Sequence, residues 1–108
     1  MQRPGRSQLR TPFVASVTLT LLDDTRVTGT GIDLSAGGIR LRTAGPVRPA
    51  TYCALRFEAG PAAPVLAFGH VIYSEALDGA YQTGVQFLRI DADGAALIGR
   101  LLAPATAV

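Results

Sequence analysis

The segment Asp33-Leu34-Ser35-Ala36-Gly37-Gly38-Ile39-Arg40-Leu41-Arg42 combines a turn signal with the start of a strand. The pair Gly37-Gly38 favours a turn, because glycine adopts left-handed backbone conformations without steric cost. In Ile39-Arg40-Leu41-Arg42 two apolar residues alternate with two arginines. Successive side chains of a strand point to opposite faces, so one face enters the core and the other presents two guanidinium groups beside the turn. This stretch predicts a β protein with polar groups gathered at one hairpin.

The same period of two runs through most of the chain. Alternation is cleanest between Phe13 and Leu22, where apolar residues occupy every second position. Further stretches rich in β-forming residues follow at regular spacing, separated by Gly, Pro and Asp. The pattern predicts an antiparallel sheet or barrel of six strands. The expected strands are Phe13–Leu22, Val27–Ile32, Ile39–Arg42, Tyr52–Glu58, Val65–Tyr73 and Tyr81–Leu88.

Two glycines, Gly29 and Gly31, interrupt the second expected strand. Glycine inside a strand indicates a β-bulge or a close approach of another backbone. The end of this strand delivers Asp33. We therefore expect an irregular strand directly before the turn.

Beyond Asp91 the period changes to that of a helix, which Pro104 ends. Asp91 or Asp93 can cap its first turn. Gly94 and Gly99 weaken the helix, so we expect it to depend on packing against the sheet. The face expected to be buried consists of Ala95, Ile98, Leu101 and Leu102.

Length and composition are those of one small globular domain. The chain has 108 residues, of which 48% are apolar, and a formal net charge of +2. A pI near 9.2 admits an anionic partner. Ten arginines offset by eight acidic residues are nevertheless far from the dense basic stripe of a general DNA binder. Any useful positive charge must therefore be local, and we expect no binding to DNA.

The residues that would indicate a disulfide, a metal site or a membrane span are lacking in the sequence. One cysteine cannot form an intramolecular disulfide, and no Cys/His cluster has metal-ligand spacing. No stretch approaches the roughly 18 to 20 apolar residues of a spanning helix, and the first ten residues are polar. We expect a cytoplasmic protein without a metal, a cofactor or membrane insertion.

Two short motifs carry the chemistry. The pattern Asp33-x-Ser35-x-x-Gly38 needs three residue types at fixed offsets, which makes it specific. Arg6-x-x-x-Arg10 is weak by itself, because all ten cationic residues are arginines and such a pair arises easily by chance. The two motifs flank one alternating strand, and together they indicate a receptor for an anion and a base.

With both motifs in this order, the sequence resembles the PilZ domains, which bind the second messenger cyclic di-GMP through Arg-x-x-x-Arg and a following Asp/Asn-x-Ser-x-x-Gly. The resemblance continues through Gly38–Arg42, through Gly84-Val85-Gln86-Phe87 and to the terminal helix, so it covers nearly the whole chain. It implies an all-β fold with one helix, a six-stranded antiparallel β-barrel with a C-terminal α-helix. Residues 1–12 would form a flexible arm that carries the arginine motif, and residues 13–103 the barrel and helix.

The residue types suit a cyclic dinucleotide. Arg6 and Arg10 can bind phosphate oxygens or the guanine O6/N7 pair through two parallel hydrogen bonds. The Asp33 carboxylate can accept from guanine N1–H and its amine. Ser35 can donate or accept at a base edge, and Gly38 lets the backbone approach a flat ligand or adopt positive φ. With Arg40 as a secondary member, the expected ligand site is Arg6, Arg10, Asp33, Ser35, Gly38 and Arg40.

The same residues also have purely structural interpretations. The arginine pair could belong to a solvated tail, and the Asp33–Gly38 segment could be an Asx turn whose glycines supply left-handed positions. Arg42 is expected on a solvent face. His70 has no catalytic partner at a recognisable spacing, so we expect it to be a histidine of the barrel without a catalytic role. Cys53 alternates with apolar residues, so we expect it to be a small buried residue.

No enzymatic motif accompanies the ligand motifs: the sequence has no nucleophile elbow, P-loop or metal set. We therefore expect a receptor and not an enzyme. The chain would act as an adaptor, a monomer or weak dimer that orders its arm on ligand binding and signals to an unidentified effector protein. One alternative is a barrel that binds single-stranded nucleic acid, which requires exposed aromatic platforms. The other is a protein-interaction module that binds no ligand.

Overall fold

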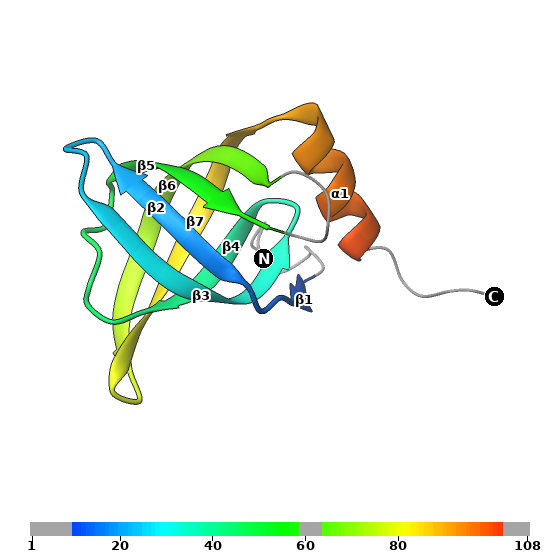
Figure 1. The fold of residues 1–108 in the computed structure, drawn as a ribbon. Coiled ribbons are helices and arrows are strands. Elements are labelled where there is room, and N and C mark those ends of the chain that lie inside the picture. The colour runs from blue at the N-terminus through cyan, green and yellow to red at the C-terminus, as the bar shows by residue number, and fades with distance from the viewer. Residues whose placement is uncertain (1–9, 59–63, 103–108) are drawn as a thin grey trace, which may run out of the picture.

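The computed structural model describes residues 10–58 and 64–102, which form a β-barrel with a helix at one end (Figure 1). The expected fold class is confirmed, and a seventh strand is added to the six expected ones. The elements are β1 (Arg10–Pro12), β2 (Ser16–Leu21), β3 (Arg26–Ser35), β4 (Gly38–Thr43), β5 (Tyr52–Phe57), β6 (Val65–Leu77), β7 (Ala80–Ile90) and α1 (Ala92–Leu102).

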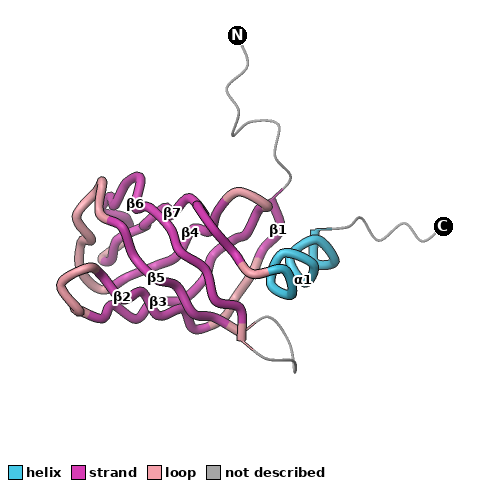
Figure 2. Tube along the Cα trace, turned by 90° about the horizontal axis from the view of Figure 1, so that it is seen from above, coloured by secondary structure: helices cyan, strands magenta, loops and turns pink. Residues whose placement is uncertain are grey.

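All strand pairings are antiparallel, and they close on themselves. The order is β1-β3-β2-β5-β6-β7-β4, and β4 also pairs with β3. That last pairing joins the two ends of the row, so β2 to β7 form a closed barrel (Figure 2). Closure satisfies the backbone hydrogen bonds that an open sheet leaves at its edges.

The first expected strand is divided in two. β1 and β2 pair with successive parts of β3, and between them only two backbone hydrogen bonds hold the chain, from Phe13 N to Ile32 O and from Gly31 N to Ala15 O. Arg10–Pro12 is thus a strand, although we expected it to belong to a flexible arm. The remainder of the expected arm, residues 1–9 with Arg6, lies outside the described residues.

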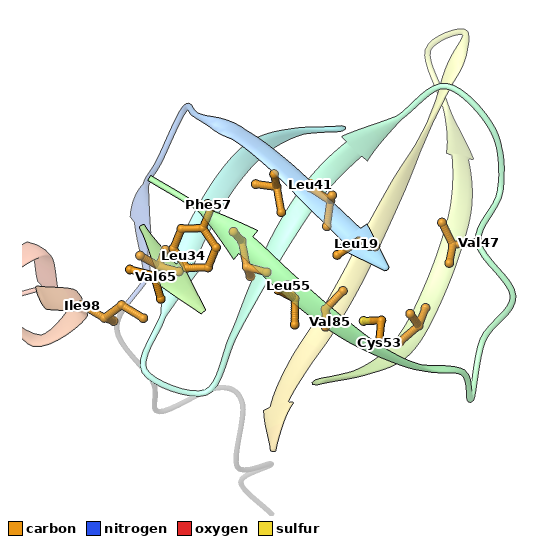
Figure 3. Close-up of a cluster of buried hydrophobic side chains, with 13 residues drawn as sticks. Leu19, Leu34, Leu41, Val47, Cys53, Leu55, Phe57, Val65, Val85 and Ile98 are labelled. Carbon is orange, nitrogen blue, oxygen red and sulfur yellow. The ribbon is translucent and has the colours of Figure 1, made fainter. Parts of the chain in front are cut away.

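The barrel interior is filled by the inward positions of the alternating strands (Figure 3). Val17 and Leu19 are fully buried, as the alternation predicted, and so is Cys53. The apolar environment of Cys53 raises the pKa of its thiol to about 11, so the thiol stays protonated at neutral pH. Cys53 is therefore a core residue, as expected.

Helix α1 lies against one end of the barrel and is capped as predicted. Asp91 Oδ1 accepts a hydrogen bond from the Gly94 backbone N–H at 2.7 Å. The buried face agrees with the expected one at Ile98, which is buried, and at Leu102, which packs against the core. It differs elsewhere: Gly94 is buried, whereas Ala95 and Leu101 are exposed. The reason is close packing at Gly94, where a Cβ would lie 2.9 Å from the Val65 side chain. No helix in the described part of the chain is long and apolar enough to span a membrane.

The β6–β7 hairpin is longer than predicted and projects from the end of the barrel opposite α1 (Figure 1). Its turn is the expected Asp78-Gly79 pair, in which both residues have positive φ, 51° and 81°. Positive φ at both central residues matches the twist of a two-residue hairpin. The side chain of Arg42 reaches this turn and donates to the Asp78 carbonyl at 3.1 Å.

Candidate functional site

A bulge in β3 determines the face on which Asp33 lies. The register between β3 and β4 shifts between Gly31 and Asp33, so Ile32 is an extra residue in β3 that has no partner in β4. One extra residue reverses the alternation of every side chain after it. Leu34 consequently enters the core with no exposed surface, and Asp33 lies outside the barrel opposite Arg40.

The two glycines of β3 permit this geometry. A Cβ at Gly31 would lie 2.6 Å from the carbonyl oxygen of Phe13, and one at Gly29 would lie 2.5 Å from that of Arg42. Real Cβ atoms do not approach backbone oxygens so closely. The expected bulge and the expected close approaches are both confirmed.

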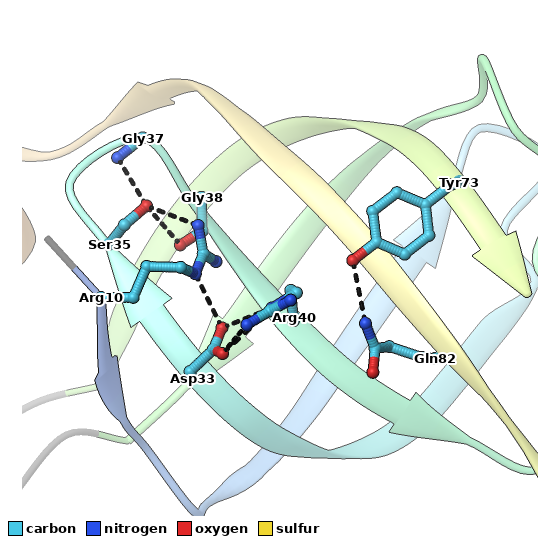
Figure 4. Close-up of polar contacts among 8 residues, drawn as sticks. All are labelled: Arg10, Asp33, Ser35, Gly37, Gly38, Arg40, Tyr73 and Gln82. Atoms are coloured by element: carbon cyan, nitrogen blue, oxygen red, sulfur yellow. Dashed lines mark hydrogen bonds and ion pairs between the residues drawn. The ribbon is translucent and has the colours of Figure 1, made fainter. Parts of the chain in front are cut away.

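Two arginines converge on the Asp33 carboxylate (Figure 4). From β1, Arg10 Nε donates to Asp33 Oδ1 at a distance of 2.9 Å. From β4, Arg40 Nε donates to Oδ1 at 2.8 Å and to Oδ2 at 3.0 Å, and Arg40 Nη2 also donates to Oδ2. Two guanidinium groups and one carboxylate leave the cluster with a formal charge of +1. The arginine side chains are 31% and 38% exposed, so this charge remains accessible to an anion.

The cluster keeps its charges at neutral pH. Burial raises the pKa of Asp33, but hydrogen bonds from Arg40 and Arg10 outweigh burial and hold the pKa below its usual value of 3.8. The hydrogen bond to Asp33 in turn raises the pKa of the Arg40 guanidinium. An anionic ligand therefore meets two permanent cations and one permanent anion.

Ser35 joins the cluster to the hairpin. Its hydroxyl accepts hydrogen bonds from the Gly37 backbone N–H at 3.2 Å and from Arg10 Nη1 at 3.3 Å, and donates to the Gly38 carbonyl at 3.4 Å. Ser35 pairs with Gly38, and only the two residues between them form the turn. The interpretation of the whole Asp33–Gly38 segment as a turn is therefore wrong. Its aspartate and serine belong to β3.

Gly38 is required for packing and not for positive φ. Among the described glycines only Gly79 has positive φ, so the left-handed conformation expected at Gly37 or Gly38 is wrong. A Cβ at Gly38 would instead collide with the carbonyl oxygen of Val85 on β7. The glycine allows β4 and β7 to approach each other closely beneath the site.

A pocket of about 460 Å³ lies beside the cluster. It is bounded by β1, the β3–β4 hairpin, β6 and β7, and four of the expected site residues line it: Arg10, Ser35, Gly38 and Arg40. Asp33 is joined to the pocket through its two arginines. The structure thus brings together five of the six expected residues, and the sixth, Arg6, lies outside the described residues.

Tyr73 lines the same pocket and was not expected there. Gly84 pairs with Arg40 on one side and with Tyr73 on the other, and a Cβ at Gly84 would overlap the Tyr73 ring. The missing side chain lets the aromatic ring lie toward Arg40, whose pKa it also helps to raise. Gln82 Nε2 donates to the phenol oxygen at 3.2 Å and orients it (Figure 4). A glycine opposite an aromatic residue is the sequence signal that could have indicated this contact.

We expect Gly84→Ala to destabilise the barrel by about 1–3 kcal/mol, because the new methyl group must displace the Tyr73 ring. Chemical unfolding measures the effect. Gly45→Ala is the matched control, since a Cβ at Gly45 meets nothing within 4 Å. Equal stabilities of the two variants would contradict the packing argument.

Neither Arg42 nor His70 lines the pocket. The Arg42 guanidinium is engaged at the β6–β7 turn, and the His70 ring lies 5.0 Å from the ring of Tyr52. Within residues 10–58 and 64–102, no group of three His, Cys, Asp or Glu residues could hold a metal ion.

Comparison with known proteins identifies relatives at the level of family and fold. The sequence profile of the PilZ domain matches residues 4–103. No curated protein matches the chain. The structure is similar to the PilZ domain of YcgR from Escherichia coli with c-di-GMP, with a TM-score of 0.74 and 18% identity over 94% of this chain and 89% of that one.

Two longer structures are similar over part of their length. The Bacillus subtilis inhibitor of motility MotI (DgrA) has a TM-score of 0.75 and 18% identity over 93% of this chain and 50% of its own. Escherichia coli YcgR in complex with c-di-GMP has a TM-score of 0.75 and 15% identity over 89% of this chain and 43% of its own. This chain therefore spans half or less of these two proteins, and at such identities the likeness shows the fold.

Proposed function

We propose that this chain, which belongs to the PilZ domain family, is a receptor for cyclic di-GMP and not an enzyme. The single observation that carries the proposal is the Arg10–Asp33–Arg40 cluster beside a pocket of about 460 Å³. The ligand carries two phosphodiester anions, which suit accessible guanidinium groups, and guanine edges, which suit a carboxylate. Arg6 is included in the proposed site through the family motif.

The hydrogen bonds of Asp33 favour an exchange on binding. Each carboxylate oxygen already accepts two N–H groups, which is its ordinary capacity. Guanine can therefore reach the carboxylate only when an arginine leaves it. Arg10 makes one bond to Asp33, whereas Arg40 makes three. In our proposal a ligand phosphate draws Arg10 away, and the vacated Oδ1 accepts from guanine.

Tyr73 contributes an aromatic face to the proposed site. Its ring and the Arg40 guanidinium lie on either side of Gly84, and both line the pocket. Guanine stacks favourably on aromatic rings and on guanidinium planes. A base in the pocket would thus be held by its edge at Asp33 and by its face at Tyr73 or Arg40.

Calorimetric titration tests this function directly. We expect saturable binding of cyclic di-GMP and no comparable binding of a single-stranded oligonucleotide of equal charge. Tighter binding of the oligonucleotide would instead identify a single-stranded nucleic-acid binder. Binding of neither would leave a protein-interaction module without ligand and would overturn the proposal.

We further propose that ligand binding orders the N-terminal arm and that an effector protein recognises the combined surface of arm, ligand and barrel. Arg10 directly follows residues 3–9 and already lines the pocket, so a ligand held by Arg6 and Arg10 would draw residues 3–9 against the barrel. Fixing these residues costs about 1–2 kcal/mol of backbone entropy each, which the arginine contacts must offset.

We expect amide hydrogen exchange of residues 3–9 to slow when cyclic di-GMP is added, because bound phosphates would restrain the arm. The amides of β5 serve as the internal control and should not change, because β5 pairs with neither of the two strands that carry the Asp33–Gly38 motif. Unchanged exchange of residues 3–9 at ligand saturation would rule the ordering out.

A further inference from the structure

The outer face of β5, β6 and β7 carries a group of apolar side chains that nothing in the described chain covers. Tyr52 and Phe68 lie with their rings parallel, at an interplanar angle of 2° and a centroid distance of 6.3 Å. Helix α1 is at the end of the barrel and leaves this face open (Figure 2). The members of this outer patch are 41% to 52% exposed, and they are Tyr52, Leu66, Phe68, Ile72 and Leu88.

The size of the outer patch is that of a dimer interface. At these exposures its side chains present on the order of 500 Å² of apolar surface, near the upper end of the largest patch on an ordinary monomer. A dimer interface of ordinary size buries about 800 Å² per partner, of which somewhat more than half is apolar. The outer patch supplies that apolar share.

Opposite charges lie at the two ends of the outer patch, and a further exposed cation, Arg89 on β7, pairs in register with Phe68 within it. Arg56 on β5 pairs in register with Leu66, at the beginning of β6. Glu75 lies near the end of β6, and it points outward because its neighbour Ser74 bonds inward to the buried Thr83. Neither Arg56 nor Glu75 forms an ion pair with any residue in the described ranges.

We propose that the outer patch binds a second copy of this chain. Leu66 and Glu75 are equally far along β6 from the midpoint between His70 and Val71. A two-fold axis at that midpoint places the β6 strands of the two copies antiparallel and brings Glu75 of each copy to the level of Arg56 of the other. Such an interface uses the same patch on both copies, as closed dimers require. The argument for it does not rest on the proposed ligand function, although Ile72 of the outer patch also lines the pocket beside the Arg10–Asp33–Arg40 cluster.

Sedimentation velocity over a range of protein concentrations tests the proposal. The wild-type chain should show a reversible monomer–dimer equilibrium, and Phe68→Glu should be monomeric throughout, because it places a charge in the middle of the apolar contact. Val14→Glu adds the same charge at a residue that is 81% exposed and outside the outer patch, so it should dimerise normally. A monomeric wild type, or a dimeric Phe68→Glu variant, would overturn the proposal.

Charge reversal tests the two-fold arrangement itself and does not depend on a substitution inside the apolar patch. Glu75→Arg and Arg56→Glu should each raise the dimer dissociation constant roughly tenfold, since each creates two like-charge contacts. The double variant should restore the wild-type constant. Failure of restoration would refute this arrangement, and calorimetry with cyclic di-GMP on the same variants reports the proposed ligand function separately.

Discussion

Arg10→Ala is expected to lower the affinity for cyclic di-GMP roughly ten- to hundred-fold, through loss of charge-assisted hydrogen bonds worth about 1.5–3 kcal/mol. Arg10 is the expected site residue best placed to move toward a ligand, because it lines the pocket and is held by one bond to Asp33 and one to Ser35. The barrel should stay folded, since Arg40 still neutralises Asp33 in the variant. Arg6→Ala should cause a similar loss.

Isothermal titration calorimetry measures these affinities. Arg42→Ala is the matched control, because it removes an arginine from the same sheet whose side chain is turned to the β6–β7 hairpin and not to the pocket. The proposed role of the arginine motif would be wrong if both Arg6→Ala and Arg10→Ala bound the ligand as the wild type does.

The second large effect concerns ligand choice. Asp33→Ala should reduce the preference for cyclic di-GMP over cyclic di-AMP by roughly ten- to hundred-fold, the value of a charge-assisted hydrogen bond to the guanine edge. Binding of anions in general should suffer less, because the same substitution removes a negative charge and frees Arg10 and Arg40 from their shared partner. The substitution should therefore weaken guanine recognition more than it weakens phosphate binding.

Parallel titrations with the two cyclic dinucleotides give the preference ratio for the wild type and for Asp33→Ala. Asp33→Asn is the informative companion, since it keeps the side-chain shape but lacks the charge, and its amide offers one acceptor oxygen in place of two. A ratio that is unchanged in Asp33→Ala would remove Asp33 from guanine recognition and leave it a residue that positions the two arginines.

Local patterns predicted the fold because they report which face of each strand is apolar. The alternation around Val17 and Leu19 placed both residues correctly in the core, and the turn at Asp78-Gly79 follows from the backbone freedom of its residues. The family motif likewise brought together Asp33, Ser35 and Gly38, because a two-residue hairpin places them side by side whatever the rest of the fold.

Other features depend on contacts between residues distant in sequence, which no local period encodes. Arg10 belongs to a strand because β3 offers it a partner. The buried face of α1 differs in part from the expected one because Gly94 packs closely on Val65. In each case close packing between elements outweighed the local preference.

For this protein, local patterns along the chain were enough to predict the barrel class and the inward residues of the strands, since strand alternation and turn chemistry are local properties. The outward position of Asp33 between Arg10 and Arg40 depends instead on how the strands pair. A single extra residue, Ile32, reverses the alternation of β3, and its position depends on the pairing of β3 with β4. A shift of one residue in that register would have turned the aspartate toward the core, because side chains alternate with a period of two.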